Sequence, residues 1–149
     1  MASFQFRLET LQKLRQAERQ QRRLELAQAF QADEFLQSQI STLVAEASQL
    51  RIRCQAAAGP GRLNVDELLD IHRYAVVLKG RTQVLRNQRA RLQDEIERRR
   101  QALVEADRQV KVLETLREQQ REQHRADGQR LEAKDLDEIA QRRTRQAVP

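Results

Sequence analysis

The most constraining feature of this sequence is a long run of residues spaced alternately three and four positions apart, most of them apolar. It begins at Leu68 and ends at Leu113, and eleven of its fourteen positions are apolar. A 3.5-residue repeat held over this distance is typical of a coiled-coil seam, because a globular helix buries a wider face. The positions are Leu68, Ile71, Ala75, Leu78, Thr82, Leu85, Arg89, Leu92, Ile96, Arg99, Leu103, Ala106, Val110 and Leu113.

A shorter run with similar spacing lies in the first half of the chain. Its positions are Leu36, Ile40, Leu43, Ala47, Leu50 and Cys54. Upstream of it the apolar residues fall out of phase, so we expect a stutter that brings them back to the seam. These upstream residues are Leu8, Leu11, Leu14, Ala17, Leu24, Leu26 and Phe30.

One Gly/Pro cluster, at residues 56–61, separates the two runs. Gly ends helices and Pro cannot continue one. Beyond the cluster, Asn64 can cap the first N–H groups of a new helix, and Glu67 stands three residues later, as in a capping box. The sequence therefore predicts a first helix over about 4–57, a turn at 58–64 and a second helix over about 65–143.

Two long helices joined by one short turn fold back on each other. The predicted fold class is all-α: a single antiparallel coiled-coil hairpin whose second helix is longer and overhangs. With the turn near Gly61, facing residue numbers sum to about 118–125. Phe4 is then expected opposite a residue between Glu114 and Arg121, and Asp33 within about a turn of Arg89. A polar pair in such a seam fixes the register. The second helix is unpaired from about residue 118, where the seam positions become polar.

Composition agrees with long helices and excludes other classes. Four Gly and two Pro in 149 residues are too few to build the turns of a β-sandwich or barrel. A single Cys54 allows no internal disulfide, which agrees with a reducing compartment. No apolar run reaches the roughly 18–20 residues of a membrane span. We expect a cytoplasmic protein with no direct membrane insertion.

The net charge of +6 invites a nucleic-acid interpretation. Charges of both signs are mixed, however: 8 basic and 6 acidic residues lie in 1–60, 12 and 8 in 61–113, and 8 and 8 in 114–149. The basic run at 98–100 follows Asp94 and Glu95, which can pair with it at i,i+4. We expect no nucleic-acid partner, and a basic nucleic-acid-binding helical protein is the least favoured alternative.

Residues that could catalyse a reaction are scarce. His72 and His124 are isolated from other catalytic residue types, and no phosphate loop, HExxH or CxxC occurs. Asp66, Glu67 and Asp70 could suggest a metal cluster, but they suit the positive end of the helix dipole. We expect no enzymatic activity, no cofactor and no metal.

Two surfaces are candidates for partner contacts. Beyond a polar stretch at 119–125, Leu136, Ile139 and Ala140 form a stripe that nothing else in the chain is left to cover. Such a stripe favours docking into a groove of another protein, and the alternative is a frayed tail. Near the turn, Tyr74 falls outside the seam, either as an exposed contact residue or as a rim residue that covers the seam.

The two ends of the chain carry further patterns. The N-terminus contains Phe4-Gln5-Phe6-Arg7-Leu8-Glu9, and the C-terminus contains Glu132-Ala133-Lys134-Asp135-Leu136-Asp137-Glu138-Ile139-Ala140. Together with a short break between a long and a longer helix, these ends resemble the flagellar export protein family FliJ.

The resemblance implies a non-enzymatic stalk, similar in fold to the γ stalk of rotary F-type ATPases. In this family the paired termini are thought to enter the central hole of the hexameric flagellar export ATPase. The loop end contacts the cytoplasmic domain of the export gate FlhA, and members also handle export chaperones. The implied location is the cytoplasmic face of the flagellar base. The alternatives are a virulence type III secretion stalk or a generic coiled-coil spacer.

The resemblance also implies which residues meet each partner. The ATPase ring end would comprise Phe4, Phe6, Leu8, Leu11, Leu136, Asp137, Glu138, Ile139 and Ala140. The gate end would include Tyr74 and Leu78, which match an aromatic-x3-Leu pattern of the family's second helix. Leu85 departs from that pattern, since a polar residue is expected there.

Overall fold

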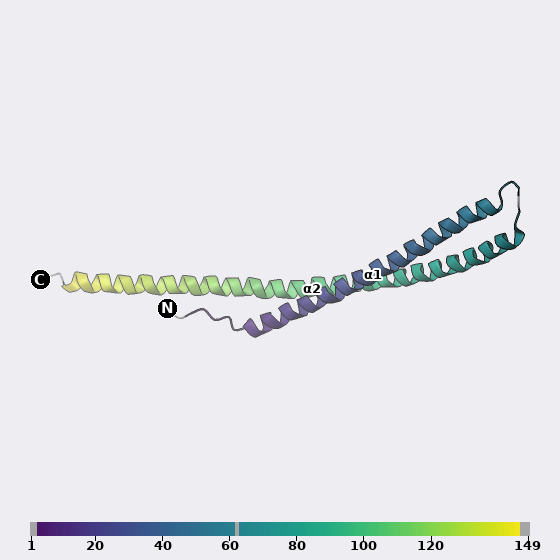
Figure 1. The fold of residues 1–149 in the computed structure, drawn as a ribbon. Helices are drawn as coiled ribbons and strands as arrows, with labels where there is room; N and C mark the ends of the chain where they lie inside the picture. Colours follow the sequence, from purple (N-terminus) through teal and green to yellow (C-terminus); the bar gives the residue numbers. More distant parts are fainter. Residues whose placement is uncertain (1–2, 62, 147–149) are drawn as a thin grey trace. The chain divides into compact units, whose positions relative to one another are not determined.

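The computed structural model describes residues 3–61 and 63–146. Two helices, α1 at Glu9–Ala57 and α2 at Val65–Gln146, account for almost all of these residues, and the described part contains no strand (Figure 1). The helices run antiparallel and contact each other, so the predicted all-α hairpin with a longer second helix is confirmed.

The turn forms where the local sequence predicts it. The amide of Ala58 still donates to the carbonyl of Cys54, and Gly61 then takes a φ of 124°, a backbone conformation that L side chains rarely adopt. Asn64 caps α2, because its Oδ1 accepts a 3.3 Å hydrogen bond from the amide of Glu67. The Glu67 carboxylate lies 3.8 Å from Arg53 on α1, which ties the two helices together beside the turn.

Helix α1 begins five residues later than predicted, at Glu9 rather than near Phe4. The amide of Glu9 donates to the carbonyl of Phe6 in a turn that precedes the helix. A non-helical chain advances about 3.3 Å per residue instead of about 1.5 Å. Phe4 therefore reaches further along α2 than predicted, and its ring centroid lies 5.8 Å from that of His124.

The chain divides into two compact units. Unit 2, residues 21–103, has an apolar seam formed by both helices. Leu78 is the most deeply buried of its side chains, with 1% of its surface exposed. Its buried apolar residues are Ala29, Ile40, Leu50, Ile71, Leu78 and Ile96, and Leu43, Cys54 and Ala75 pack against the cluster of Leu50, Ile71 and Leu78.

The predicted contact between Asp33 and Arg89 is present in the seam of unit 2. The Nε of Arg89 donates to Asp33 Oδ1 at 2.8 Å, and Gln93 donates to the same oxygen at 2.8 Å. Ten residues further along α2, the guanidinium of Arg99 donates to the carbonyl of Glu25 at 2.6 Å. These bonds satisfy the polar groups that interrupt the apolar repeat of α2.

Unit 1 comprises residues 1–20 and 104–149, and its described seam is mixed. Val110 and Leu113 of α2 are buried, and so is Phe6 in the segment before α1. Facing them, Gln12 is also buried, with 6% of its surface exposed, and its Oε1 accepts a 3.1 Å hydrogen bond from Arg117. The guanidinium of Arg117 also lies over the Phe6 ring, 5.9 Å from the centroid.

The predicted stutter of the first helix is wrong. Stepping back three and four residues from Leu36, in unchanged phase, leads to positions that are buried or partly buried except for the exposed Arg22. They are Asp33, Ala29, Leu26, Arg22, Arg19, Arg15 and Gln12. Of the upstream leucines expected in the seam, Leu26 is partly buried, whereas Leu8, Leu11, Leu14 and Leu24 are exposed. A stutter would move the buried positions to another phase without interrupting the helix, and the buried positions of α1 show no such shift. On α2, all fourteen predicted seam positions are buried or partly buried.

Candidate partner-binding surfaces

The N-terminal residues predicted to contact a partner lie against α2 within unit 1. Phe6 is buried under Arg117, and Phe4 is partly buried against His124. Leu8 and Leu11 are exposed, at 38% and 36%. The two phenylalanines therefore attach the N-terminal segment to α2, whereas the two leucines face outward and are free to meet another molecule.

The C-terminal residues predicted for the same partner lie on the last turns of α2. The described side chains from Arg130 to Arg145 are all exposed, including Leu136 at 67% and Ile139 at 50%. Asp137, Glu138 and Ala140 are exposed as well, and Glu138 lies 3.9 Å from Arg142 one turn later. The segment is helical through Gln146, so the stripe of Leu136, Ile139 and Ala140 is presented on regular helix.

In unit 1, a hollow of about 900 Å³ lies between Phe4 of the N-terminal segment and the part of α2 that precedes Leu136. Phe4 forms one wall, and α2 supplies the rest, from Glu118 to Asp135, with Leu131 as its apolar residue. The hollow ends one residue before Leu136. Its acidic residues outnumber its basic ones: the acids are Glu118, Glu122, Asp127, Glu132 and Asp135, and the bases are Arg121 and Arg125. The sequence did not predict this hollow, because it depends on Phe4 reaching beyond Arg121.

The two residues predicted for the second surface have different surroundings in unit 2. Tyr74 is 43% exposed, as expected for a residue outside the seam, and its hydroxyl donates to Glu46 at 3.2 Å. Leu78, one turn later, is buried in the core of the unit. Tyr74 can therefore touch a partner directly, whereas Leu78 supports the helix on which Tyr74 stands.

Charges in the seam are adjusted by their neighbours. Hydrogen bonds from Arg89 lower the pKa of the Asp33 carboxyl from its ordinary value, and the same contact raises the pKa of Arg89. In unit 1, the neighbouring Lys111 lowers the pKa of Asp107, and Arg19 adds to the effect at 3.3 Å. These groups are satisfied ion pairs between or along helices, which is a structural arrangement and not a poised acid or base.

The residue types that bind metals are spread out in the described part of the chain. In residues 3–61 and 63–146 no three His, Cys, Asp or Glu side chains are placed to hold a metal ion. Asp66 and Asp70 are exposed on the first turns of α2, and Asp70 lies 3.7 Å from Arg73. His72 is exposed on the same helix.

Comparison with known families decides the relationship of the chain. The profile of the family described as FliJ, flagellar FliJ protein, matches residues 4–148. The chain belongs to the FliJ family. This places it among flagellar export-related stalk proteins and agrees with the resemblance of its two ends. No curated protein and no solved structure gives a significant match to it.

The match covers both surfaces described above, since it spans Phe4 as well as Ile139. Within the described residues, neither helix is long and apolar enough at any point to cross a membrane.

Proposed function

We propose that this FliJ-family chain is a non-enzymatic stalk and adaptor of the flagellar type III export apparatus. Unit 1 inserts the paired termini into the central hole of the hexameric export ATPase and promotes its activity. Unit 2 contacts the cytoplasmic domain of the export gate FlhA through the surface around Tyr74. Export chaperones are further partners, and the protein works in the cytoplasm at the base of the flagellum.

The observation that carries the proposal is the exposed apolar stripe near the end of α2. Leu136 and Ile139 are at least half exposed on a helix whose neighbouring turns are charged. An apolar stripe on an otherwise polar helix gains stability only when another surface covers it. A ring of identical subunits around a central hole offers such a surface, and Phe4 brings the N-terminal segment to the same unit.

The ring contact is tested by measuring ATP hydrolysis by the purified export ATPase with and without this protein. Stoichiometric wild-type protein is expected to stimulate hydrolysis and to stabilise the hexamer. Leu136→Glu combined with Ile139→Glu should remove most of the stimulation, because two charges would replace the apolar stripe. The matched control is Val104→Glu with Val112→Glu, which changes two valines of similar exposure on the same helix and in the same unit.

Three results would contradict this part of the proposal. The wild-type protein could leave both the rate and the hexamer unchanged, which would favour a generic coiled-coil spacer. The Leu136/Ile139 variant could stimulate as well as the wild type, which would move the contact elsewhere. Stronger stimulation of a virulence secretion ATPase than of the flagellar one would favour the virulence alternative. Circular dichroism of each variant checks that the helices are retained.

The gate contact is tested with the isolated cytoplasmic domain of FlhA. Tyr74→Ala should weaken binding, measured by calorimetry, because it removes an exposed ring that Glu46 holds in place. Tyr74→Phe keeps the ring and loses only the hydroxyl, so it should bind nearly as well as the wild type. Equal binding of wild type and Tyr74→Ala would exclude Tyr74 as a contact. Leu78 is not used here, because its replacement would disturb the core.

A further inference from the structure

The seam of unit 2 is bordered by one edge on each side. Tyr74 and Glu46, which are joined by a hydrogen bond, mark the edge that we call the Tyr74 edge. Gln93, whose side chain donates to Asp33 at 2.8 Å, marks the other edge. Tyr74 and Gln93 occupy the g and e positions of the heptad, which flank a coiled-coil seam on opposite sides. Each edge therefore continues along both helices in steps of seven residues.

The two edges differ in charge. Over ten positions each in unit 2, the Tyr74 edge has four acidic and two basic residues, whereas the other has five basic residues and no acidic one. We call the second one the basic edge. The Tyr74 edge comprises Glu25, Ala32, Gln39, Glu46 and Arg53 of α1 and Glu67, Tyr74, Arg81, Gln88 and Glu95 of α2. The basic edge comprises Arg23, Phe30, Gln37, Val44 and Arg51 of α1 and His72, Lys79, Arg86, Gln93 and Arg100 of α2.

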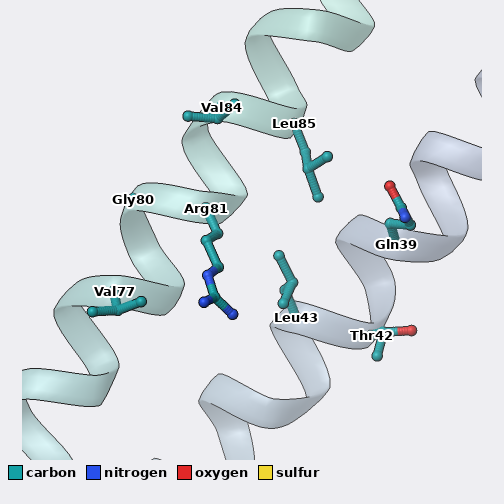
Figure 2. Close-up of a pocket in the computed structure, with 8 residues that line it drawn as sticks. All are labelled: Gln39, Thr42, Leu43, Val77, Gly80, Arg81, Val84 and Leu85. Atoms are coloured by element: carbon teal, nitrogen blue, oxygen red, sulfur yellow. The ribbon is translucent and has the colours of Figure 1, made fainter.

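The acidic residues of the Tyr74 edge have partners within the chain. Each of its four carboxylates forms a hydrogen bond or an ion pair, and the pairs are Glu25 with Arg22, Glu46 with Tyr74, Glu67 with Arg53, and Glu95 with Arg99. Figure 2 shows the middle of this edge, where Arg81 and Gln39 stand on facing helices and Leu43 and Leu85 point toward each other between them.

Most cations of the basic edge have no such partner. Arg100 lies 3.1 Å from Glu97. The other four are exposed and form no salt bridge with a described residue, and they are Arg23, Arg51, Lys79 and Arg86. Unpaired cations along one side of a rod attract and orient a negatively charged partner.

Exposed apolar side chains lie among these cations. Val44, on the basic edge itself, is 48% exposed, and Val76, three residues before Lys79, is 58% exposed. The row of positions next to this edge on its outer side contains two acidic residues in unit 2, Glu34 and Glu97. Both are more than one helical turn from these valines in sequence register. The stretch around Val44 thus combines apolar surface with positive charge.

We propose that the basic edge of unit 2 binds an acidic amphipathic helix of another protein, which lies along the hairpin as a third strand. Its apolar residues contact Val44 and Val76, and its carboxylates meet Arg51, Lys79 and Arg86. The spacing favours a helix, because cations seven residues apart and one stripe of a partner helix share a rise of about 10.5 Å per repeat. The site lies across the seam from Tyr74 and uses no residue assigned to the ring or the gate, so it does not rest on the proposed function.

Other anionic occupants suit the basic edge less well. A nucleic acid is held chiefly through its phosphates and makes no use of Val44 and Val76. A lipid surface is attracted by any cluster of cations and does not require seven-residue spacing. A second copy of this chain would have to offer its Tyr74 edge, whose carboxylates already have partners.

The test uses the full chain and two 28-residue helical peptides that share one leucine per heptad and carry either Glu or Lys at the flanking positions. Fluorescence anisotropy is expected to give at least tenfold tighter binding of the Glu peptide, and added salt should weaken this binding. Arg51→Glu, Lys79→Glu and Arg86→Glu together should abolish binding of the Glu peptide and permit binding of the Lys peptide.

The matched control for charge is the combination of Arg73→Glu, Arg91→Glu and Arg98→Glu. These three residues are exposed on other rows of α2 in the same unit, so the net charge changes equally while the basic edge stays intact. The control should bind the Glu peptide within about threefold of the wild type, because surface charges away from the contact are screened.

The apolar part of the site is tested by Val44→Gln, which should weaken binding of the Glu peptide at least fivefold. Val84→Gln is its control, because Val84 is similarly exposed, at 56%, and lies on the side of α2 shown in Figure 2. Neither change should lower the melting temperature, since glutamine is a better helix former than valine.

The proposal is overturned if neither peptide binds, if both bind equally, or if the basic-edge triple variant and its control behave alike. A larger loss of binding with Val84→Gln than with Val44→Gln would place the peptide on the Tyr74 edge and also overturn it. Tighter binding of duplex DNA or of phosphatidylserine vesicles than of the Glu peptide would make the occupant a nucleic acid or a lipid surface. Self-association in sedimentation equilibrium that the basic-edge variant removes would make it a second copy. Each of these results contradicts the proposal and leaves the ring and gate contacts untouched.

Discussion

Units 1 and 2 use the same two helices but fill their seams differently. In unit 2 both helices contribute apolar side chains, such as Ile40 from α1 and Leu78 from α2. In unit 1, α2 contributes the apolar Val110 and Leu113 to the seam, whereas α1 contributes the polar Gln12, Arg15 and Arg19. Burial of apolar surface is the main source of stability in such a pair. The difference therefore predicts a stable unit 2 and a weakly held α1 segment in unit 1.

The same difference explains where apolar residues are exposed. Because polar residues occupy the α1 seam of unit 1, Leu11 and Leu14 face outward. Arg19 even buries its Nε without a hydrogen-bond partner in the described residues. An unsatisfied buried donor lowers stability. Unit 1 thus buries less apolar surface in its own seam and leaves apolar side chains exposed. The proposed ring contact requires such exposed side chains.

The largest expected effect tests the apolar seam of unit 2. Leu78→Ala should lower the free energy of unfolding by about 2–5 kcal/mol, because it empties a fully buried position. Val84→Ala, on the exposed face of the same helix, should change it by less than about 0.5 kcal/mol. Urea titration followed by circular dichroism measures both. Similar losses for the two variants would mean that the seam is not the main source of stability in this unit.

The polar pair within the apolar seam gives the next effect. Replacing Asp33 and Arg89 together by leucine should raise the stability of unit 2 by about 1–4 kcal/mol and loosen its register. Spin labels at Gln39 and Gln83 would report the register as the width of their distance distribution. A more stable variant with an unchanged narrow distribution would show that the pair does not fix the register, and a less stable one would contradict both expectations.

A smaller gain is expected from repairing the seam of unit 1. Arg19→Met with Gln12→Leu should stabilise the α1 segment by about 1–2 kcal/mol, because both positions are in the seam and Arg19 buries an unpaired donor. Asp107 keeps Lys111 at 3.0 Å as a partner. Hydrogen exchange of the amides in residues 9–20 measures the change. Unchanged protection of these amides would show that polar seam residues do not weaken the segment.

The smallest expected effect is on the melting temperature at low pH. The pKa of Asp33 is lowered in the folded chain, chiefly by hydrogen bonding to Arg89. A lowered folded pKa adds stability above the unfolded value of about 3.8, and this stability is lost as the pH falls through the folded pKa. The melting temperature should therefore fall less between pH 5 and about pH 2 in Asp33→Asn than in the wild type. Glu34→Gln, on the neighbouring exposed position, is the control and should leave the pH dependence unchanged.

The fold was largely predictable because its determinants are local. Helix α2 was predicted at its first residue, since Asn64 both follows the Gly/Pro turn and caps the helix. The seam of α2 was predicted throughout, because its 3.5-residue repeat is nearly unbroken.

The candidate surfaces were predicted less completely. Tyr74 was placed correctly outside the seam, but the pattern that paired it with Leu78 could not distinguish an exposed residue from a buried one. The position of Phe4 against His124 depends on where α1 begins, and helix starts without a strong capping residue are poorly specified by sequence. The hollow that Phe4 forms with α2 follows from that position.

The sequence by itself determined two helices, one turn and the seam of α2, because capping, glycine conformation and side-chain periodicity act within a few residues. Only the tertiary structure decided which face of α1 enters the seam of unit 1. The leucines there suggested one face, but the buried positions of α1 keep in unit 1 the phase that they have in unit 2. Gln12 is therefore buried and Arg19 partly buried, and Leu11 and Leu14 are left exposed.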